Sequence, residues 1–171
     1  VRVLNTNRPA HPGTVIADLG PENPERVTSI AYKERQTVVK VASTRMLGES
    51  GFLARVFEVL ARHEVIVDVV TTSEVSVSLT ANDAEAVERA RPELEQLGDC
   101  EVTTGHTILA VVGQHLAERK GLGAEILSAI SGAGVNVEMI SYASGSINLQ
   151  MVIADADISA AVSTLHDVLF G

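Results

Sequence analysis

The sequence has one cysteine, no tryptophan and few aromatic residues of any kind. A single cysteine, Cys100, excludes a disulfide within the chain and favours a reducing compartment, so we expect a cytoplasmic protein in which Cys100 packs as a small apolar residue. Aromatic residues make up only 3% of the chain. Hydrophobic residues of all kinds make up 46% of the chain, so the protein must build its core mainly from valine, isoleucine, leucine and alanine.

Positive charge is also scarce. Lysine and arginine number 13 against 22 acidic residues, which gives a formal net charge of −9. This balance argues against a nucleic-acid or anionic-membrane partner. No apolar run approaches the roughly 18–20 residues that span a bilayer, and no secretory signal is present. A small ligand or another protein is the expected partner.

The first 26 residues resemble the end of another unit. The chain begins at Val1 in strand-like sequence rather than at a methionine, so we expect a piece of a longer protein. Turn-forming residues follow, and prolines mark a linker near residues 21–24. Arg8 and Thr14 could belong to an anion site, but a solvated loop is the favoured interpretation.

Residues 46–80 carry the clearest pattern in the chain. A polar turn at residues 48–51 precedes apolar residues spaced at three and four, which predicts a helix from Phe52 with Ser50 as its N-cap. Residues 65–70 are rich in β-branched side chains, and residues 75–80 alternate apolar with polar. The stretch therefore predicts helix, strand, turn and strand.

Similar patterns occur on both sides of this stretch. They predict strands at residues 27–32 (VTSIAY), 37–43, 100–106 and 107–113, a charged turn at residues 33–35, and helices at residues 84–97 and 158–170. Pro92 should kink the first of these helices or shorten one end.

An internal repeat links the two halves of the chain. With one offset of 70 positions and no gap, residues 37–80 align with residues 107–150, so that Gly51 meets Gly121 and Asp68 meets Glu138. Each copy follows most of the split β-α-β-β-α-β plan, but the second copy lacks its last strand. We predict an α+β fold of two ferredoxin-like βαββαβ domains, the first inserted into the second, with residues 27–32 supplying the missing strand. The expected domains are residues 36–105 and residues 27–35 plus 106–171.

No set of nucleophile, base and acid stands out. The five histidines are scattered, and residues 120–123 match neither a Walker A nor a dinucleotide-binding loop, so we expect no metal site and no catalysis in this fragment. The same residues suit an amino-acid ligand. The N–H groups at the start of the predicted helix would hold its carboxylate, and Asp68 would face its ammonium group. An equal alternative is that Asp68 only pairs within the fold.

Three motifs carry a family resemblance. Gly51-Phe52-Leu53, Val67-Asp68 and the run TTSEVSVSLT at residues 71–80 closely resemble the regulatory region of aspartate kinases, particularly the monofunctional, lysine-sensitive type. The resemblance extends to Phe170, and residues 1–16 are similar to the last strand and loop of the family's kinase domain. It implies tandem ACT domains, the first inserted into the second.

The resemblance also implies a function and a site. The parent enzyme would phosphorylate L-aspartate with ATP and magnesium in a kinase domain before Val1, and this fragment would need no cofactor. The fragment would form a homodimer, contact the kinase domain and bind L-lysine, with L-threonine as the second choice, between two subunits. By position, the effector contacts would be Met46, Glu49, Phe52, Leu53, Val67, Asp68, Ser73, Glu74 and Val75. A possible second effector site comprises Gly123, Asn136 and Glu138.

Two departures from the family keep alternatives open. Glu49 and Ile66 stand where lysine-sensitive relatives have serine, and either change could weaken lysine binding or alter the effector. An alternative function is therefore a dimerisation module that senses little or nothing.

Overall fold

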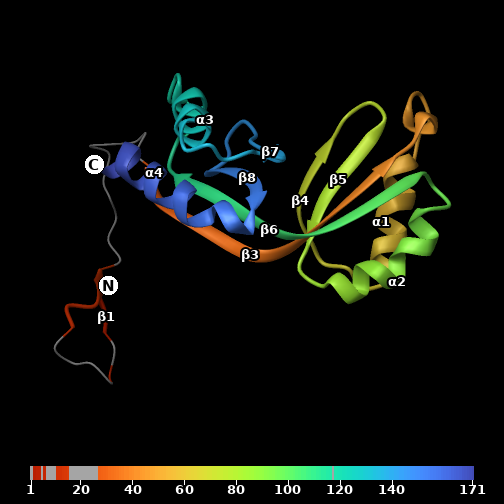
Figure 1. Cartoon of the computed structure of the whole chain (residues 1–171), viewed down its shortest axis with the longest axis horizontal. Coiled ribbons are helices and arrows are strands. Elements are labelled where there is room, and N and C mark those ends of the chain that lie inside the picture. Colours follow the sequence, from red (N-terminus) through yellow and green to blue (C-terminus); the bar gives the residue numbers. More distant parts are fainter. Residues whose placement is uncertain (1, 5, 7–10, 16–26, 117) are drawn as a thin grey trace.

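Two strands much longer than the others run through the structure, β3 (Val27–Ala42) and β6 (Asp99–Gly113). They pair antiparallel and cross the middle of Figure 1 together. The computed structural model describes residues 2–171 except 5, 7–10, 16–26 and 117. Val1, Arg8 and the predicted linker lie outside this part.

The other elements divide between the two ends of these long strands. Helices α1 and α2 lie at one end, and α3 and α4 lie at the other (Figure 1). In chain order the remaining elements are β1 (Arg2–Val3), β2 (Thr14–Val15), a 3₁₀ helix (Thr44–Met46), α1 (Phe52–Arg62), β4 (Val67–Thr72), β5 (Ser76–Ala81), α2 (Ala84–Leu94), α3 (Leu122–Gly132), β7 (Met139–Ser141), β8 (Asn148–Ala154), a second 3₁₀ helix (Asp155–Asp157) and α4 (Ile158–Phe170).

Six strands form one antiparallel sheet in the order β4-β5-β3-β6-β8-β7, and β1 pairs separately with β2. The C-terminal part of β3 lies between β5 and β6, whereas its N-terminal part pairs with β6, as in Ile30 opposite Val111 and Tyr32 opposite Leu109. Residues 27–32 thus supply the last strand of the second unit, as predicted. Both units have the ferredoxin-like order of strands and helices, which confirms the α+β fold.

The predicted turn at residues 33–35 is wrong, because β3 continues through it. The register between β3 and β6 shifts between Lys33 and Gln36 and again before Val38, and Arg35 has a φ of 58°. On β6, Gly105 has a φ of 82°. Charged residues in a short segment resemble a turn, but here they form irregularities that resemble β-bulges within a strand already paired along its length.

Each unit has its own hydrophobic core. Val39, Val41 and Leu79 pack with α1 and α2 in the first core, and Leu109 and Met151 pack with α3 and α4 in the second. A third cluster contains strand residues only: Val38, Val69, Ile108, Met139 and Val152. It lies on the helix-free face of the sheet, where the edge strands β4 and β7 contact each other.

Replacing Gly105 with alanine should lower the free energy of unfolding by about 1–2 kcal/mol. A side chain is unfavourable at this positive φ, although a Cβ would meet nothing within 4 Å. Gly123→Ala is the matched control, because Gly123 lies in α3 with equal space and no positive φ. It should stabilise the chain by roughly 0.5–1 kcal/mol. Urea unfolding followed by circular dichroism checks both values, and equal effects would refute the strained-backbone explanation.

Candidate functional site

The start of α1 offers unoccupied backbone N–H groups. Gly51 is the N-cap, with a φ of 82°, and no side chain caps the helix. The prediction that Ser50 is the N-cap is therefore wrong, because glycine's left-handed turn brings the chain into the helix through the backbone alone. The first-turn N–H groups have no partner within a helix, and together with the helix dipole they favour an anion.

Most of the predicted effector residues meet at this end of the first unit. The turn between β4 and β5 joins the loop before α1 through a hydrogen bond of 2.8 Å from Ser43 N–H to the Val75 carbonyl. Ser73 closes the turn, with its hydroxyl 2.7 Å from that of Ser76. The predicted residues gathered here are Met46, Glu49, Phe52, Leu53, Ser73, Glu74 and Val75. Among them Phe52 is buried, whereas Leu53 and Val75 are exposed.

Glu49 already has a partner in the chain. Its carboxylate lies 2.7 Å from the guanidinium of Arg55, which also sits 5.8 Å from the centre of the Phe52 ring. The pair is exposed, so its contribution to stability is small. It does place a negative charge beside the start of α1, where the helix N–H groups favour an anion.

Val67 and Asp68 lie at the opposite end of β4 from this turn. Asp68 is five residues before Ser73, which corresponds to roughly 17 Å along a strand. Its carboxylate is 2.5 Å from the ammonium of Lys33 on β3. Within one chain, therefore, the structure does not bring Asp68 to the N-terminus of α1.

The second unit repeats this arrangement. Gly121 is the N-cap of α3 with a φ of 87°, and Gly123 lies in the first turn of that helix. Asn136 and Glu138 lie before β7, and Glu138 approaches Nε2 of His106 at 3.0 Å. Gly123 and Glu138 are thus repeat counterparts of the α1 start and of Asp68, and they too occupy different parts of their unit.

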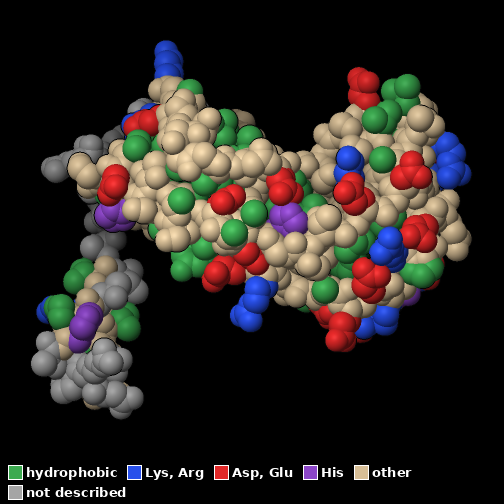
Figure 2. Space-filling model, in the orientation of Figure 1, with side chains coloured by type: hydrophobic (Ala, Val, Ile, Leu, Met, Phe, Trp, Pro, Cys, Tyr) green, Lys and Arg blue, Asp and Glu red, His purple; other side chains and the backbone are tan. Residues whose placement is uncertain are grey.

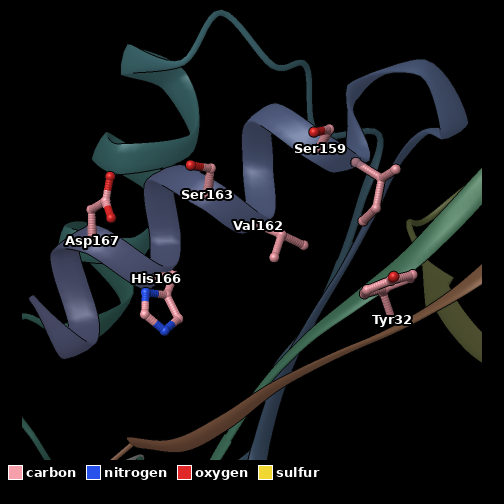
Figure 3. A pocket seen from close by; sticks show the side chains of 7 residues that line it. Tyr32, Ser159, Val162, Ser163, His166 and Asp167 are labelled. Carbon is pink, nitrogen blue, oxygen red and sulfur yellow. The ribbon is translucent and has the colours of Figure 1, made fainter.

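A groove that the sequence did not indicate lies between α4 and β3. Its cavity is about 430 Å³ and is lined in part by Tyr32, Val162 and His166. Val162 and His166 lie on the side of α4 that faces Tyr32 (Figure 3). The periodicity of α4 predicted the helix, but which of its residues face β3 depends on the pairing of β3 with β6.

Cys100 lies half-buried on β6. Burial raises the pKa of the Cys100 thiol, although Arg91 opposes this effect. Among the described residues, no group of three or more histidine, cysteine or acidic side chains could hold a metal ion. Within the same ranges, no helix is long and apolar enough to cross a membrane.

Comparison with known proteins places the chain in a family. The model for the ACT domain matches residues 39–96 and 109–169, one match for each unit of the repeat. The chain belongs to the ACT domain family.

The relatives of this chain are aspartate kinases or parts of them. Aspartokinase 2 of Arabidopsis thaliana, a chloroplastic protein, is 35% identical over 99% of this chain and 33% of its own length. A putative C-terminal regulatory domain of aspartate kinase from Porphyromonas gingivalis W83 is 32% identical, with a TM-score of 0.74 over 84% of this chain and 97% of that one. E. coli aspartokinase III in complex with lysine and aspartate (T-state) is 35% identical, with a TM-score of 0.77 over 89% and 35%.

The matches cover only one region of each full-length aspartokinase. The chain spans about a third of the length of the curated relatives it matches. It is the regulatory, tandem ACT region of an aspartate kinase.

Proposed function

We propose that this chain binds an end-product amino acid, L-lysine before L-threonine, between two copies of itself and thereby feedback-inhibits phosphorylation of L-aspartate. The observation that carries the proposal is the uncapped start of α1 beside the turn at residues 73–75. The kinase domain of the parent enzyme would hold ATP and magnesium, and this region would need no cofactor. A relative solved with lysine supports the choice of effector.

The start of α1 suits the α-carboxylate of an amino acid. Backbone N–H groups of Phe52 and Leu53 would donate to it, and the positive end of the helix dipole adds to the attraction. Exposed Leu53 and Val75 offer apolar surface for the methylene groups of a lysine side chain. Glu74 in the neighbouring turn would face one of the two ammonium groups of lysine, and the other ammonium group requires a second carboxylate.

A second copy would supply that carboxylate. β4 is an edge strand of the sheet, and Ile66 just before it is 64% exposed. If two copies of β4 pair antiparallel about Val70, residue 68 of one lies opposite residue 72 of the other, with Cα atoms about 5 Å apart. Asp68 of the partner subunit would then lie beside the turn at residues 73–75, and the site would be complete only in a dimer.

Calorimetric titration with L-lysine, L-threonine and L-methionine tests the proposal. Selective binding of lysine, near one molecule per chain, is the expected result. Threonine binding would keep the sensor and change its effector. If none of the three binds, the chain is a dimerisation module rather than a sensor. The ion pairs of Asp68 with Lys33 and of Glu49 with Arg55 favour this second function, because they satisfy both carboxylates without a ligand.

Replacing Glu49 with serine should strengthen lysine binding by roughly 2- to 5-fold, because it removes a negative charge beside the carboxylate site. Arg55→Ala is the matched control. It leaves the Glu49 charge without its partner and should weaken binding by a similar factor. Calorimetry on both variants measures the effect, and a change of the same sign in both would contradict this role for Glu49.

The second unit holds the candidate site for a further effector, at Gly123, Asn136 and Glu138. Its uncapped α3 start supports an anion there. However, Glu125 in the first turn of α3 lies 2.8 Å from Arg119, so that end already holds an ion pair. A structural role for this unit is the favoured interpretation.

A further inference from the structure

Gln36 and His106 lie opposite each other where the two units join. They are partners in the register of β3 and β6, so their side chains leave the sheet on the same face. The repeat offset of 70 positions also relates them, so each occupies the same place in its own unit. Arg35 and Gly105, the residues just before them, both have a positive φ. The pair therefore lies where the pairing between the two long strands is irregular.

Both side chains contain a buried polar atom without a partner. Gln36 is 1% exposed and His106 is 7% exposed. Among the described residues, Oε1 of Gln36 and Nδ1 of His106 are the buried side-chain polar atoms that have no hydrogen bond. Buried polar atoms are normally paired, so two such atoms on opposite residues require a common explanation.

The other hydrogen bonds of these side chains make both atoms acceptors. Nε2 of Gln36 donates to the Glu34 carbonyl at 3.0 Å, which leaves the amide oxygen free. Nε2 of His106 lies 3.0 Å from Glu138. Because a carboxylate accepts, Nε2 carries the proton of the neutral ring and Nδ1 presents a lone pair. Two acceptors cannot bond to each other, but one added proton on Nδ1 makes it a donor.

The charges on this face of the sheet suit a positively charged ring. Glu138 and Glu101 line the same cavity as His106, together with Lys40. Figure 2 shows acidic side chains and a histidine on the surface between the two halves of the molecule. The described strands β5, β7 and β8 contain no charged residue.

The other charged side chains on neighbouring elements have partners of their own or are exposed. Lys33 of β3 and Asp68 of β4 neutralise each other at 2.5 Å. Asp155 accepts a hydrogen bond from the hydroxyl of Thr107, which follows His106 and therefore points to the opposite face of β6. The exposed charged residues of β3 nearby are Glu34 and Arg35.

We propose that Gln36 and His106 form a pH-operated link between the two units. When Nδ1 of His106 takes up a proton from solvent, it donates a hydrogen bond to Oε1 of Gln36, while Nε2 keeps its bond to Glu138. The link then joins β3, β6 and the segment before β7. It is separate from the start of α1, so it stands or falls independently of the effector site proposed above.

The direction of the pH dependence follows from the donor. The bond to Gln36 exists only when the ring is protonated, so it stabilises the junction at acidic pH and is lost as the pH rises. Histidine ordinarily changes charge between about pH 5 and pH 8. The link should therefore form and break within this range.

The test follows the ¹H and ¹⁵N resonances of the His106 imidazole in the whole chain from about pH 8 to about pH 5. At the acidic end Nδ1 should carry a slowly exchanging proton with a nuclear Overhauser effect to the Gln36 side chain. At the alkaline end it should carry none. If Nδ1 stays unprotonated at the acidic end, or is protonated without contact to Gln36, the proposal is wrong. This measurement needs no variant.

Gln36→Met keeps the length of the side chain and removes the acceptor. The pH at which half of the Nδ1 sites carry a proton should fall by about one pH unit, a 10-fold loss of proton affinity. Gln150→Met is the matched control. Gln150 is four residues before Ala154, the partner of His106 on β8, and so lies roughly 13 Å away along the strand. The control should behave as the wild type, and a Gln36→Met chain that also does so would overturn the link.

Urea unfolding of the wild type and Gln36→Met checks the link through stability. The substitution should lower the urea midpoint more at about pH 5.5 than at about pH 8, because only the acidic chain has the link to lose. The bond from Gln36 to the Glu34 carbonyl is lost at either pH. Equal losses at the two pH values would therefore mean that this bond, and not a link to His106, is the role of Gln36.

Discussion

The Asp68→Ala chain should bind L-lysine roughly 100-fold more weakly than the wild type, because truncating one partner of a desolvated charge pair costs several kcal/mol. Folding should be almost unaffected. The Asp68 carboxylate and its Lys33 partner are both substantially exposed, and such a pair contributes about 1 kcal/mol or less. Calorimetric titration measures the affinity, and a thermal melt verifies the fold.

Lys33→Ala is the control for this experiment. It breaks the same ion pair but leaves the carboxylate in place, so lysine affinity should stay constant or rise. In the full-length enzyme, Asp68→Ala should abolish feedback inhibition and leave aspartate phosphorylation intact. If the Asp68→Ala enzyme retains wild-type inhibition by lysine, Asp68 is not the ammonium partner.

Replacing Leu109 with alanine should lower the free energy of unfolding by about 2–5 kcal/mol, the range for removing a buried leucine. Leu109 is fully buried on β6, opposite Tyr32 of β3 and Met151 of β8. Since β3 and β6 pass through both units, the loss should appear as one shifted transition rather than two. Urea denaturation followed by circular dichroism measures it.

Leu53→Ala is the control for that result, because Leu53 is 37% exposed at the start of α1. The Leu53→Ala substitution should lower the free energy of unfolding by less than about 1 kcal/mol. Two separate transitions in the Leu109→Ala chain, with one at the wild-type midpoint, would contradict the view that the long strands couple the units.

The repeat is the reason why so much of the fold could be predicted. Alternation and helical spacing recur with one offset, and the number of strands in each copy predicts that residues 27–32 supply the missing strand. The bounds of α4 (Ile158–Phe170) also coincide with those predicted. The continuity of β3 and β6 could not be predicted, because Lys33 and Arg35 resemble a turn in composition and only pairing across the sheet keeps them extended.

The sequence predicts a set of residues for the candidate site but not the geometry that relates them. Residue spacing indicates which residues lie at the start of a helix or of a strand. It does not give the distance of roughly 17 Å between Asp68 and the turn after β4. The ion pair of Asp68 with Lys33 depends on the register of β3, which the sequence leaves open.

Sedimentation velocity with and without L-lysine tests the central claim most directly. The chain is diluted until monomer is detected, and lysine is then added at a saturating concentration. A site completed by Asp68 of the partner subunit binds lysine only in the dimer, so lysine should shift the population toward the dimer by mass action. Lysine that binds the chain while the monomer fraction stays constant would contradict an effector site shared between two copies.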